Sequence, residues 1–325
     1  TCDRAIAKGK KGACPTSCPS DGKVCTADKL VGALASCTRR CVHQLLKPCC
    51  GDGKRAGAEQ CDDGNLVNTD LCTNKCSWPG GPLLITEVVT TPTSGEMVEI
   101  FNPTGKTQSL ADIHLADLET YHLVVEGKKP AHASDFIARF PSKAAIGPGQ
   151  FRIVALAGAA SFASTHGKKP HFEMTSQDTT VPDMVAAVPG AIGSSPTLTN
   201  SGEVLVLFHW DGYSDRVKDL DYLIWGGATP VNKSGVCKDG PDPGTKSSCY
   251  LGDTGPVNQS RLTAHATGGS FHRCNFKEGK EKKAGGNGSG GHDETSEPLK
   301  ATWVVNSATA AKRTPGAGPP KGLCP

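Results

Sequence analysis

The chain has 325 residues, of which 39 are glycine and 23 are proline, and its formal net charge at pH 7 is +3. Glycine and proline are the residues least compatible with helix interiors, so this composition excludes a helical bundle and predicts many turns. Hydrophobic residues make up 37% of the chain, enough for a core, and the charge is too small to indicate nucleic acid as a partner.

The 15 cysteines are concentrated near the N-terminus, with eleven in the first 76 residues and four in the rest. A short segment at this density is usually held together by disulfides or by zinc. Close cysteines are spaced C-x3-C rather than C-x2-C, and His43 is the only histidine before residue 114, which favours disulfides. We therefore expect a secreted or cell-surface protein whose signal peptide has been removed. We expect no membrane span, because no apolar run approaches about 18 residues.

An odd number of cysteines leaves at least one thiol free or bonded to another chain. Cys237 and Cys249 bracket a loop rich in proline and glycine, and we expect them to pair. Cys274 and Cys324 could then pair with each other, which places the odd cysteine in the N-terminal part. Cys2, at the end of the chain, is our candidate for an intermolecular disulfide, and the alternative is one buried free thiol.

Residues 1–48 show no helical or strand period, and we expect a loop-dominated cysteine-rich module there. Residues 49–79 contain the motifs C-C-G-D-G, E-Q-C-D-D-G-N and D-L-C-T-N-K-C. These motifs resemble the myxobacterial-type cysteine-rich repeat, although that repeat usually has D-G-C where this chain has D-L-C. The resemblance implies local disulfides among Cys50, Cys61, Cys72 and Cys76.

The same segment places five oxygen-bearing side chains within nine residues around a glycine: Asp62, Asp63, Asn65, Asn68 and Asp70. Calcium takes six to eight oxygen ligands and tolerates flexible loops, so one interpretation is a calcium site. The other is a polar turn in which Asp and Asn side chains cap their own backbone. The EF-hand template does not fit, because no glutamate stands at its twelfth position.

After a short linker at 78–82, the pattern changes to short apolar strands separated by turn residues. Strands are expected at 83–89, 97–102, 151–156, 203–210 and 219–225, and one short helix at 159–165. Repeated short strands with Gly, Pro, Asn and Asp turns predict a mainly β protein, a sandwich or a barrel.

Several of these strands carry a family pattern. The segments L-I-T-E-V from Leu84, E-M-V-E-I-F-N-P-T-G from Glu96 and P-G-Q-F-R-I-V from Pro148 are examples, as are L-T-N-S-G-E-V from Leu198 and T-P-G-A from Thr314. They resemble the lamin-tail domain, which implies an immunoglobulin-like β-sandwich over residues 83–319. Insertions then fall near 119–146 and 227–268, and residues 320–325 form a C-terminal tail.

One further loop has unusual composition, the glycine-rich segment 285–291 followed by His292, Asp293 and Glu294. These three side chains could bind a metal or act as acid and base. The alternative is a hydrogen-bonded loop that holds the last strand. The preceding run 277–283 mixes lysines with Glu278 and Glu281, and we expect a solvated loop there.

We find no motif of a hydrolase or nucleotide-binding enzyme. The prediction is a secreted, non-enzymatic structural or adhesion protein that assembles with itself, as a filament or lattice, or with other surface or matrix components. The first alternative is a calcium-dependent module that binds a glycan or a protein. The second is a hydrolase or nuclease accessory that uses the loop at 292–294. No cofactor other than calcium is implied.

Overall fold

The computed structural model describes residues 15–23, 25–33, 36, 38–46, 49–62, 64–67, 72–77, 80–306 and 313–324. The chain divides into two compact units, and the boundary between them falls between residues 78 and 79. No helix in the described ranges is long and apolar enough to cross a membrane. Each unit is described on its own below.

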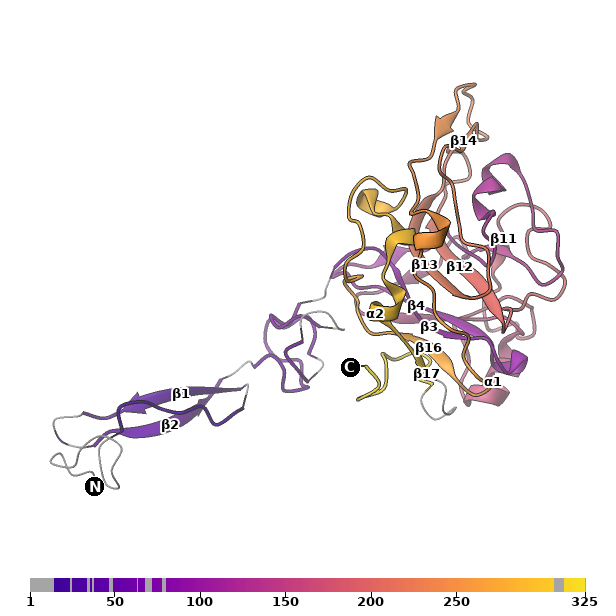
Figure 1. Cartoon of the computed structure of the whole chain (residues 1–325). Coiled ribbons are helices and arrows are strands. Elements are labelled where there is room, and N and C mark those ends of the chain that lie inside the picture. The colour runs from indigo at the N-terminus through magenta and orange to yellow at the C-terminus, as the bar shows by residue number, and fades with distance from the viewer. Residues whose placement is uncertain are drawn as a thin grey trace. The chain divides into compact units, whose positions relative to one another are not determined.

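The first half of the N-terminal unit contains an antiparallel hairpin, which corrects the expectation of loops alone over residues 1–48 (Figure 1). Strand β1 spans Thr26–Val31 and β2 spans Arg40–Leu45. Disulfides join Cys18 to Cys41 and Cys25 to Cys49 beside these strands. None of the twelve strand residues is fully buried. The strands therefore lack the alternating apolar pattern that a half-buried sheet would require.

The second half of this unit, residues 49–77, has disulfide sulfur where a larger domain has an apolar core. Disulfides join Cys50 to Cys76 and Cys61 to Cys72, using the four cysteines that the repeat resemblance singled out. Cys61, Cys72 and Cys76 are buried against one another, with Cys50 packed beside them. This unit is a disulfide-rich module.

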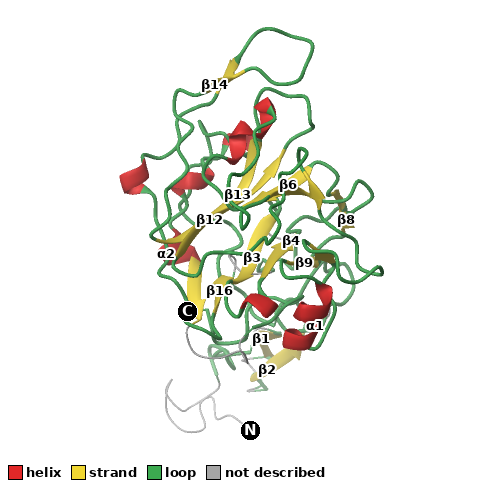
Figure 2. Cartoon of the chain, turned by 90° about the vertical axis from the view of Figure 1, so that its right-hand side faces the viewer, coloured by secondary structure: helices red, strands yellow, loops and turns green. Residues whose placement is uncertain are grey.

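The second unit is a β-sandwich (Figure 2). One sheet has the order β10-β9-β4-β3-β16-β17 and the other has the order β11-β7-β6-β12-β13. The first sheet comprises Phe172–Glu173, Phe151–Ala155, Met97–Phe101, Leu84–Val89, Ser270–Arg273 and Trp303–Asn306. The second comprises Val185–Ala186, Ile137–Arg139, Ile113–Ala116, Gly202–His209 and Lys218–Gly226. Neighbouring strands are antiparallel except β10 and β9.

Short elements complete the unit. Two further hairpins pair β5 (Gln108–Ser109) with β8 (Ala145–Ile146) and β14 (Cys237–Lys238) with β15 (Ser248–Cys249). Helix α1 is Ala159–His166 and α2 is Leu299–Thr302. The 3₁₀ turns η1 to η5 are Thr93–Gly95, Tyr121–Glu126, Pro256–Asn258, Ser289–Gly291 and Glu294–Ser296.

The mainly β fold class predicted from sequence is confirmed. Each of the five apolar segments forms a strand within a residue or two of its expected bounds, and α1 lies at the expected helix. The core is filled by side chains of both sheets, such as Val98, Leu205 and Phe271. His114 takes part as an aromatic residue, stacked on Phe208 at 4.9 Å between ring centroids. Burial lowers the pKa of His114 to about 3, so its imidazole is neutral.

The two segments expected as insertions differ in their relation to the sheets. Segment 119–146 contributes β7, which pairs with β6 inside the five-stranded sheet. Segment 227–268 adds no strand to either sheet, although Leu262 forms an isolated bridge with Trp225 of β13. The β14–β15 hairpin lies at its tip, with a bond between Cys237 and Cys249 across it. The outer face of β13 is therefore covered by loops rather than by solvent, and all but the first and last of its residues are buried.

Candidate functional site

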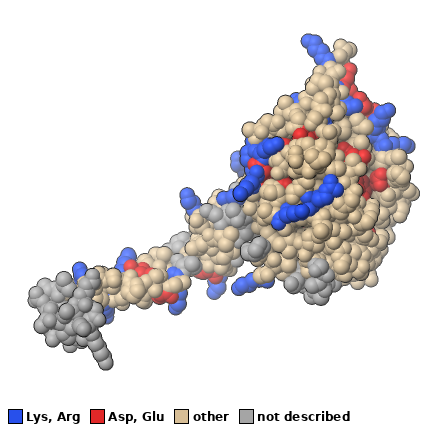
Figure 3. Space-filling view, in the orientation of Figure 1, with Lys and Arg blue, Asp and Glu red and all other residues tan. Residues whose placement is uncertain are grey.

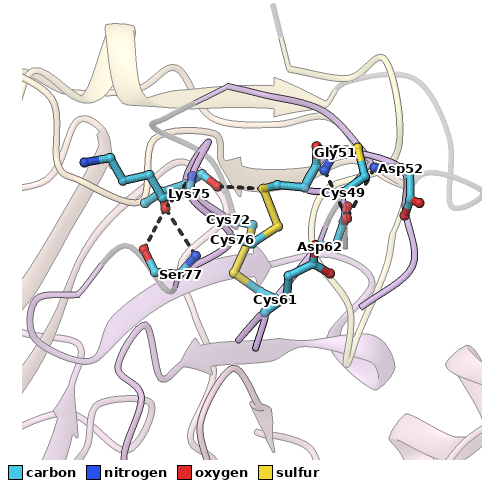
Figure 4. Close-up of a disulfide and its surroundings, with 12 residues drawn as sticks. Cys49, Gly51, Asp52, Cys61, Asp62, Cys72, Lys75, Cys76 and Ser77 are labelled. Carbon is cyan, nitrogen blue, oxygen red and sulfur yellow. Dashed lines mark hydrogen bonds between the residues drawn. A yellow bond between two sulfur atoms is a disulfide. The ribbon is translucent and has the colours of Figure 1, made fainter. Parts of the chain in front are cut away.

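The first predicted site surrounds Asp62 in the N-terminal unit, where the side chain acts as an acceptor for the backbone. Its Oδ2 accepts hydrogen bonds from the N–H groups of Gly51 (3.0 Å) and Asp52 (3.2 Å). Its Oδ1 accepts from Gly53 and Gly64, both at 2.9 Å. Figure 4 shows Asp62 near Gly51 and Asp52 and close to the disulfide cysteines. Burial raises the pKa of Asp62, but the four N–H donors outweigh it and hold the pKa below its usual value.

This geometry matches the capping interpretation for the two described members of the predicted calcium set. Asn65 also uses its Oδ1 locally, accepting the N–H of Val67 at 2.6 Å. Asp63, Asn68 and Asp70 lie outside the described residues. Calcium binding at this loop therefore stays a prediction, and Asp62 is placed as the structural cap of the disulfide loops.

The second predicted site is the loop at 292–294, and here the structure separates the three residues. The carboxylate of Asp293 accepts hydrogen bonds from the hydroxyls of Thr254 (2.7 Å) and Thr295 (2.6 Å). It thereby ties the 254 loop to η5. His292 and Glu294 meet elsewhere, together with two glutamates that we had expected to be solvated.

These four residues, Glu278, Glu281, His292 and Glu294, form what we call the carboxylate–histidine cluster. Two chain segments bring them together, since residues 278–283 run beside residues 286–294. The N–H of Asp293 donates to the carbonyl of Lys282 at 2.9 Å, and the N–H of Gly288 donates to the carbonyl of His292 at 2.8 Å. The three glutamates are 3–5% exposed.

The inner atoms of the cluster face one another without hydrogen bonds. Nδ1 of His292 lies 3.5 Å from Oε1 of Glu281, 3.7 Å from Oε2 of Glu278 and 4.0 Å from Oε1 of Glu294. Within the described part of the chain, this nitrogen and Oε1 of Glu278, Glu281 and Glu294 are buried and have no hydrogen-bond partner. Buried polar groups are otherwise almost always paired, so four unpaired atoms in one place require an explanation.

A lysine binds one oxygen of each of two of these glutamates. Lys283 Nζ donates to Oε2 of Glu278 at 2.9 Å and to Oε2 of Glu281 at 2.8 Å. Burial lowers the pKa of Lys283, but these two carboxylates outweigh it and raise the pKa above its usual value. When all groups are ionised, three carboxylates and one ammonium leave two negative charges uncompensated.

The cluster is electrostatically unfavourable as it stands. Burial raises the pKa of Glu281 to about 9, and the charge of Glu278 adds to the effect. Burial, followed by the charges of Glu278 and Glu281, raises the pKa of Glu294 well above its usual value. Burial, with Lys283 beside it, lowers the pKa of His292, so the imidazole is neutral. A neutral imidazole and adjacent carboxylates are the donors of a cation site.

Glu278 and Glu281 were missed because their run alternates with lysines, as solvated loops do. Their burial comes from segment 286–294, which pairs with their own segment through the bridge between Lys282 and Asp293 and is itself tightly folded at Gly286 and Gly288. A Cβ on Gly286 would lie 2.1 Å from the carbonyl oxygen of His292, and one on Gly288 would lie 2.5 Å from Oε1 of Glu294. The signal that could have found them is E-x-x-E followed by H-x-E, with glycines between.

Two buried ion-pair networks hold the loops near the cluster against the sandwich. Arg273 of β16 donates to Asp221 of β13 at 2.5 Å and to Glu297 at 2.7 Å, and all three side chains are at most 2% exposed. Lys233 is fully buried, with Nζ 2.8 Å from Asp219 and 3.3 Å from Asp253. These pairs fix the segments around 233, 253 and 297 to β13 and β16.

A cavity of about 480 Å³ lies beside the cluster. Its walls come from residues 214–218, from the 242–251 segment and from Gly286, Asn287 and Gly288. Asn287 bonds the opposite wall, since its side chain accepts the N–H of Leu251 at 2.8 Å and donates to the carbonyl of Leu251 at 2.9 Å. The glycine-rich segment is thus both a wall of the cavity and the cover of the cluster.

A separate buried acid pair joins the six-stranded sheet to the C-terminal segment. Glu87 of β3 lies opposite Glu99 of β4, and the N–H of Thr314 donates to Glu87 at 3.0 Å. Burial raises the pKa of Glu87 to about 8. Burial, and then the charge of Glu87, raises the pKa of Glu99 well above its usual value. Burial therefore favours the protonated form of both carboxyl groups.

No protein-family model and no curated protein matches this chain. Among solved structures, the chain is similar to the crystal structure of a DUF4876 family protein from Bacteroides thetaiotaomicron. The two are 16% identical, with a TM-score of 0.40, and the match covers 74% of this chain and 75% of that chain. What the fold and site define is a β-sandwich with a loop-built cavity, in a chain that also carries a disulfide-rich N-terminal unit.

Proposed function

We propose that the chain is a secreted, non-enzymatic adhesion or structural protein of an extracellular surface or matrix, whose sandwich binds a partner. Six disulfides among the described residues support the extracellular assignment, because such bonds persist in oxidising compartments. The assignment as non-enzymatic is supported by the placement of Asp293, which accepts hydrogen bonds from Thr254 and Thr295 and does not join His292 and Glu294.

The observation that carries the binding role is the cavity on the sandwich. Its volume lies within the range of about 300–1,000 Å³ that is usual for ligand sites. The lining combines cationic, anionic, amide and apolar groups: Arg216, Lys218, Asp242, Tyr250, Leu251 and Asn287. Lys and Arg are also interspersed with Asp and Glu over the face of the sandwich in Figure 3. Mixed polarity favours a neutral polar partner, such as a surface polysaccharide, over a polyanion.

The first test places a charge in the cavity. We expect Leu251→Asp to weaken binding of the fluorescently labelled full chain to an array of surface polysaccharides by at least about 10-fold, through lost apolar contact and desolvation. Leu251 is 48% exposed, so the variant should fold. Val257→Asp is the matched control, because Val257 is 94% exposed and does not line the cavity. Equal losses in both variants, or no polysaccharide bound by the unsubstituted chain, would contradict the proposal.

A second candidate role, covalent self-assembly, is favoured by the number of cysteines. The six disulfides use twelve of the 15, and the remaining Cys2, Cys14 and Cys37 lie outside the described residues. Three cysteines can form at most one more bond within the chain. At least one sulfur is therefore left for a second chain or as a free thiol.

Light scattering of the oxidised protein tests this role. We expect a mass of at least twice the 33.7 kDa of one chain, and we expect Cys2→Ser alone to reduce it to one chain. Cys14→Ser and Cys37→Ser are the controls, and they should leave the larger species in place. A monomeric unsubstituted protein would rule out assembly through Cys2.

A further inference from the structure

The four unpaired atoms of the carboxylate–histidine cluster define the size and charge of what is missing from it. All four are buried, and the three glutamates that carry the oxygens are at least 95% buried. A water molecule could pair with some of these atoms, but it would not offset the two negative charges that remain when Lys283 and all three carboxylates are ionised. A divalent cation would offset both charges and satisfy all four atoms at once.

The distances suit direct coordination. Bonds of about 2.0–2.2 Å from one metal to nitrogen and oxygen place neighbouring ligand atoms about 3.0–3.5 Å apart. The Nδ1 to Oε1 distances of 3.5 Å and 4.0 Å are close to this spacing. One atom each from Glu278, Glu281 and His292 also lies within 4.8 Å of the others. Small shifts of side chains would therefore complete the site.

We propose that Glu278, Glu281, Glu294 and His292 bind one divalent first-row transition-metal ion, of the Zn²⁺ or Mn²⁺ class, through three carboxylate oxygens and Nδ1. The imidazole decides the class, because calcium and magnesium prefer oxygen ligands only. Four protein ligands with no open position are typical of a structural metal rather than a catalytic one.

The surroundings of the cluster supply what a metal site needs beyond its ligands. Lys283 holds Oε2 of Glu278 and Oε2 of Glu281, which fixes the orientation of both carboxylates. Glu278 itself has a φ of 57°, in the left-handed region that side chains other than glycine rarely adopt. Gly288 lets the backbone pass directly over Oε1 of Glu294.

The ion would also organise the cavity, since the segment that carries His292 forms one of its walls. This consequence rests on the proposed binding function, whereas metal binding itself does not. Two measurements distinguish the metal proposal from the binding proposal. Metal affinity is measured on the full chain alone, and polysaccharide binding is measured with and without metal.

The experiment uses the full oxidised chain, treated with a chelator, dialysed and titrated separately with Zn²⁺, Mn²⁺ and Ca²⁺ by calorimetry. We expect Zn²⁺ or Mn²⁺ to bind at least 100-fold more tightly than Ca²⁺, and native mass spectrometry to show this ion at one per chain. Glu294→Gln should abolish this binding. Lys283→Ala should weaken it by about 10–100-fold, as loss of an outer partner does.

Asp293→Asn is the matched control, because Asp293 lies between two of the proposed ligands but outside the cluster. It should leave the affinity unchanged. If Glu294→Gln does not fold, His292→Gln takes its place, since the His292 side chain is 20% exposed and its loss disturbs less packing. No ion bound, a Ca²⁺ affinity equal to that for Zn²⁺ and Mn²⁺, or an equal loss in Asp293→Asn would each overturn the proposal.

Discussion

Replacing Arg273 by Met is expected to lower the free energy of unfolding by about 3–5 kcal/mol, the usual cost of removing one partner from a buried ion pair. The guanidinium lies between Asp221 and Glu297 with no exposure, and it also donates to the carbonyl of Ile85 at 2.8 Å. Methionine would leave both carboxylates buried without a cation. Equilibrium unfolding in guanidinium chloride without reductant, followed by tryptophan fluorescence, measures the loss of stability.

Two further variants show whether the unpaired charge is the cause. Adding Asp221→Asn and Glu297→Gln to Arg273→Met removes both charges, so this triple variant should recover part of the loss. Arg216→Met is the matched control, because Arg216 is exposed and makes one bond to a backbone carbonyl. It should change stability by less than about 1 kcal/mol. A triple variant that is no more stable than Arg273→Met would show that the lost packing matters more than the charge. If Arg273→Met does not fold, Arg273→Lys takes its place. Because lysine keeps the charge, its loss of stability should be smaller than the loss expected for Arg273→Met.

The second large effect is a loss of stability on raising the pH, caused by Glu87. Its pKa is about 8 in the folded chain against 4.5 for the ordinary group, with burial as the main cause and Thr314, Arg313 and Lys168 opposing it. The folded state therefore holds the proton more tightly. Its contribution is fully present below pH 4.5 and is lost as the pH rises through 8. One pKa unit corresponds to about 1.4 kcal/mol, so the loss is on the order of 5 kcal/mol.

Glu87→Gln isolates this contribution, since the amide keeps an oxygen that can accept the N–H of Thr314. Chemical unfolding at pH 5, 7 and 9 should show a much shallower fall in stability for this variant than for the unsubstituted chain. Glu126→Gln, at an exposed position, should retain the full fall. The difference between the curves is assigned to Glu87 together with the effect of its charge on the neighbouring Glu99. Identical slopes would show that Glu87 is not the group responsible.

The sandwich was predictable because its strands carry their own signal. Segments such as Val204–Phe208 are apolar and end at Gly, Asn or Asp turns. A disulfide joins Cys274 to Cys324 in the structure, the pairing that the even number of cysteines in that half allowed. The β1–β2 hairpin was not predictable from hydrophobicity, because disulfides rather than buried side chains hold it. Its strands therefore have no apolar face to detect.

The candidate site was predictable only in part for a related reason. His292 and Glu294 stood out by their glycine-rich context, yet Asp293 between them serves a different loop. Glu278 and Glu281 are buried only because a segment ten residues further along folds over them. Burial of that kind depends on contacts between separate segments, such as the hydrogen bond from the N–H of Asp293 to the carbonyl of Lys282, and local composition does not encode it.

The bond between Cys274 and Cys324 determines how the sandwich would carry a mechanical load. A pull between the N-terminal unit and any attachment beyond Cys324 would pass from β16 directly through the two sulfurs, at a sequence separation of 50. The enclosed chain, with the carboxylate–histidine cluster and β17, would carry none of that tension. The enclosed stretch would have an extended length of roughly 170 Å, and pulling on the oxidised protein would not extend it. Only reduction of the disulfide would make this length available.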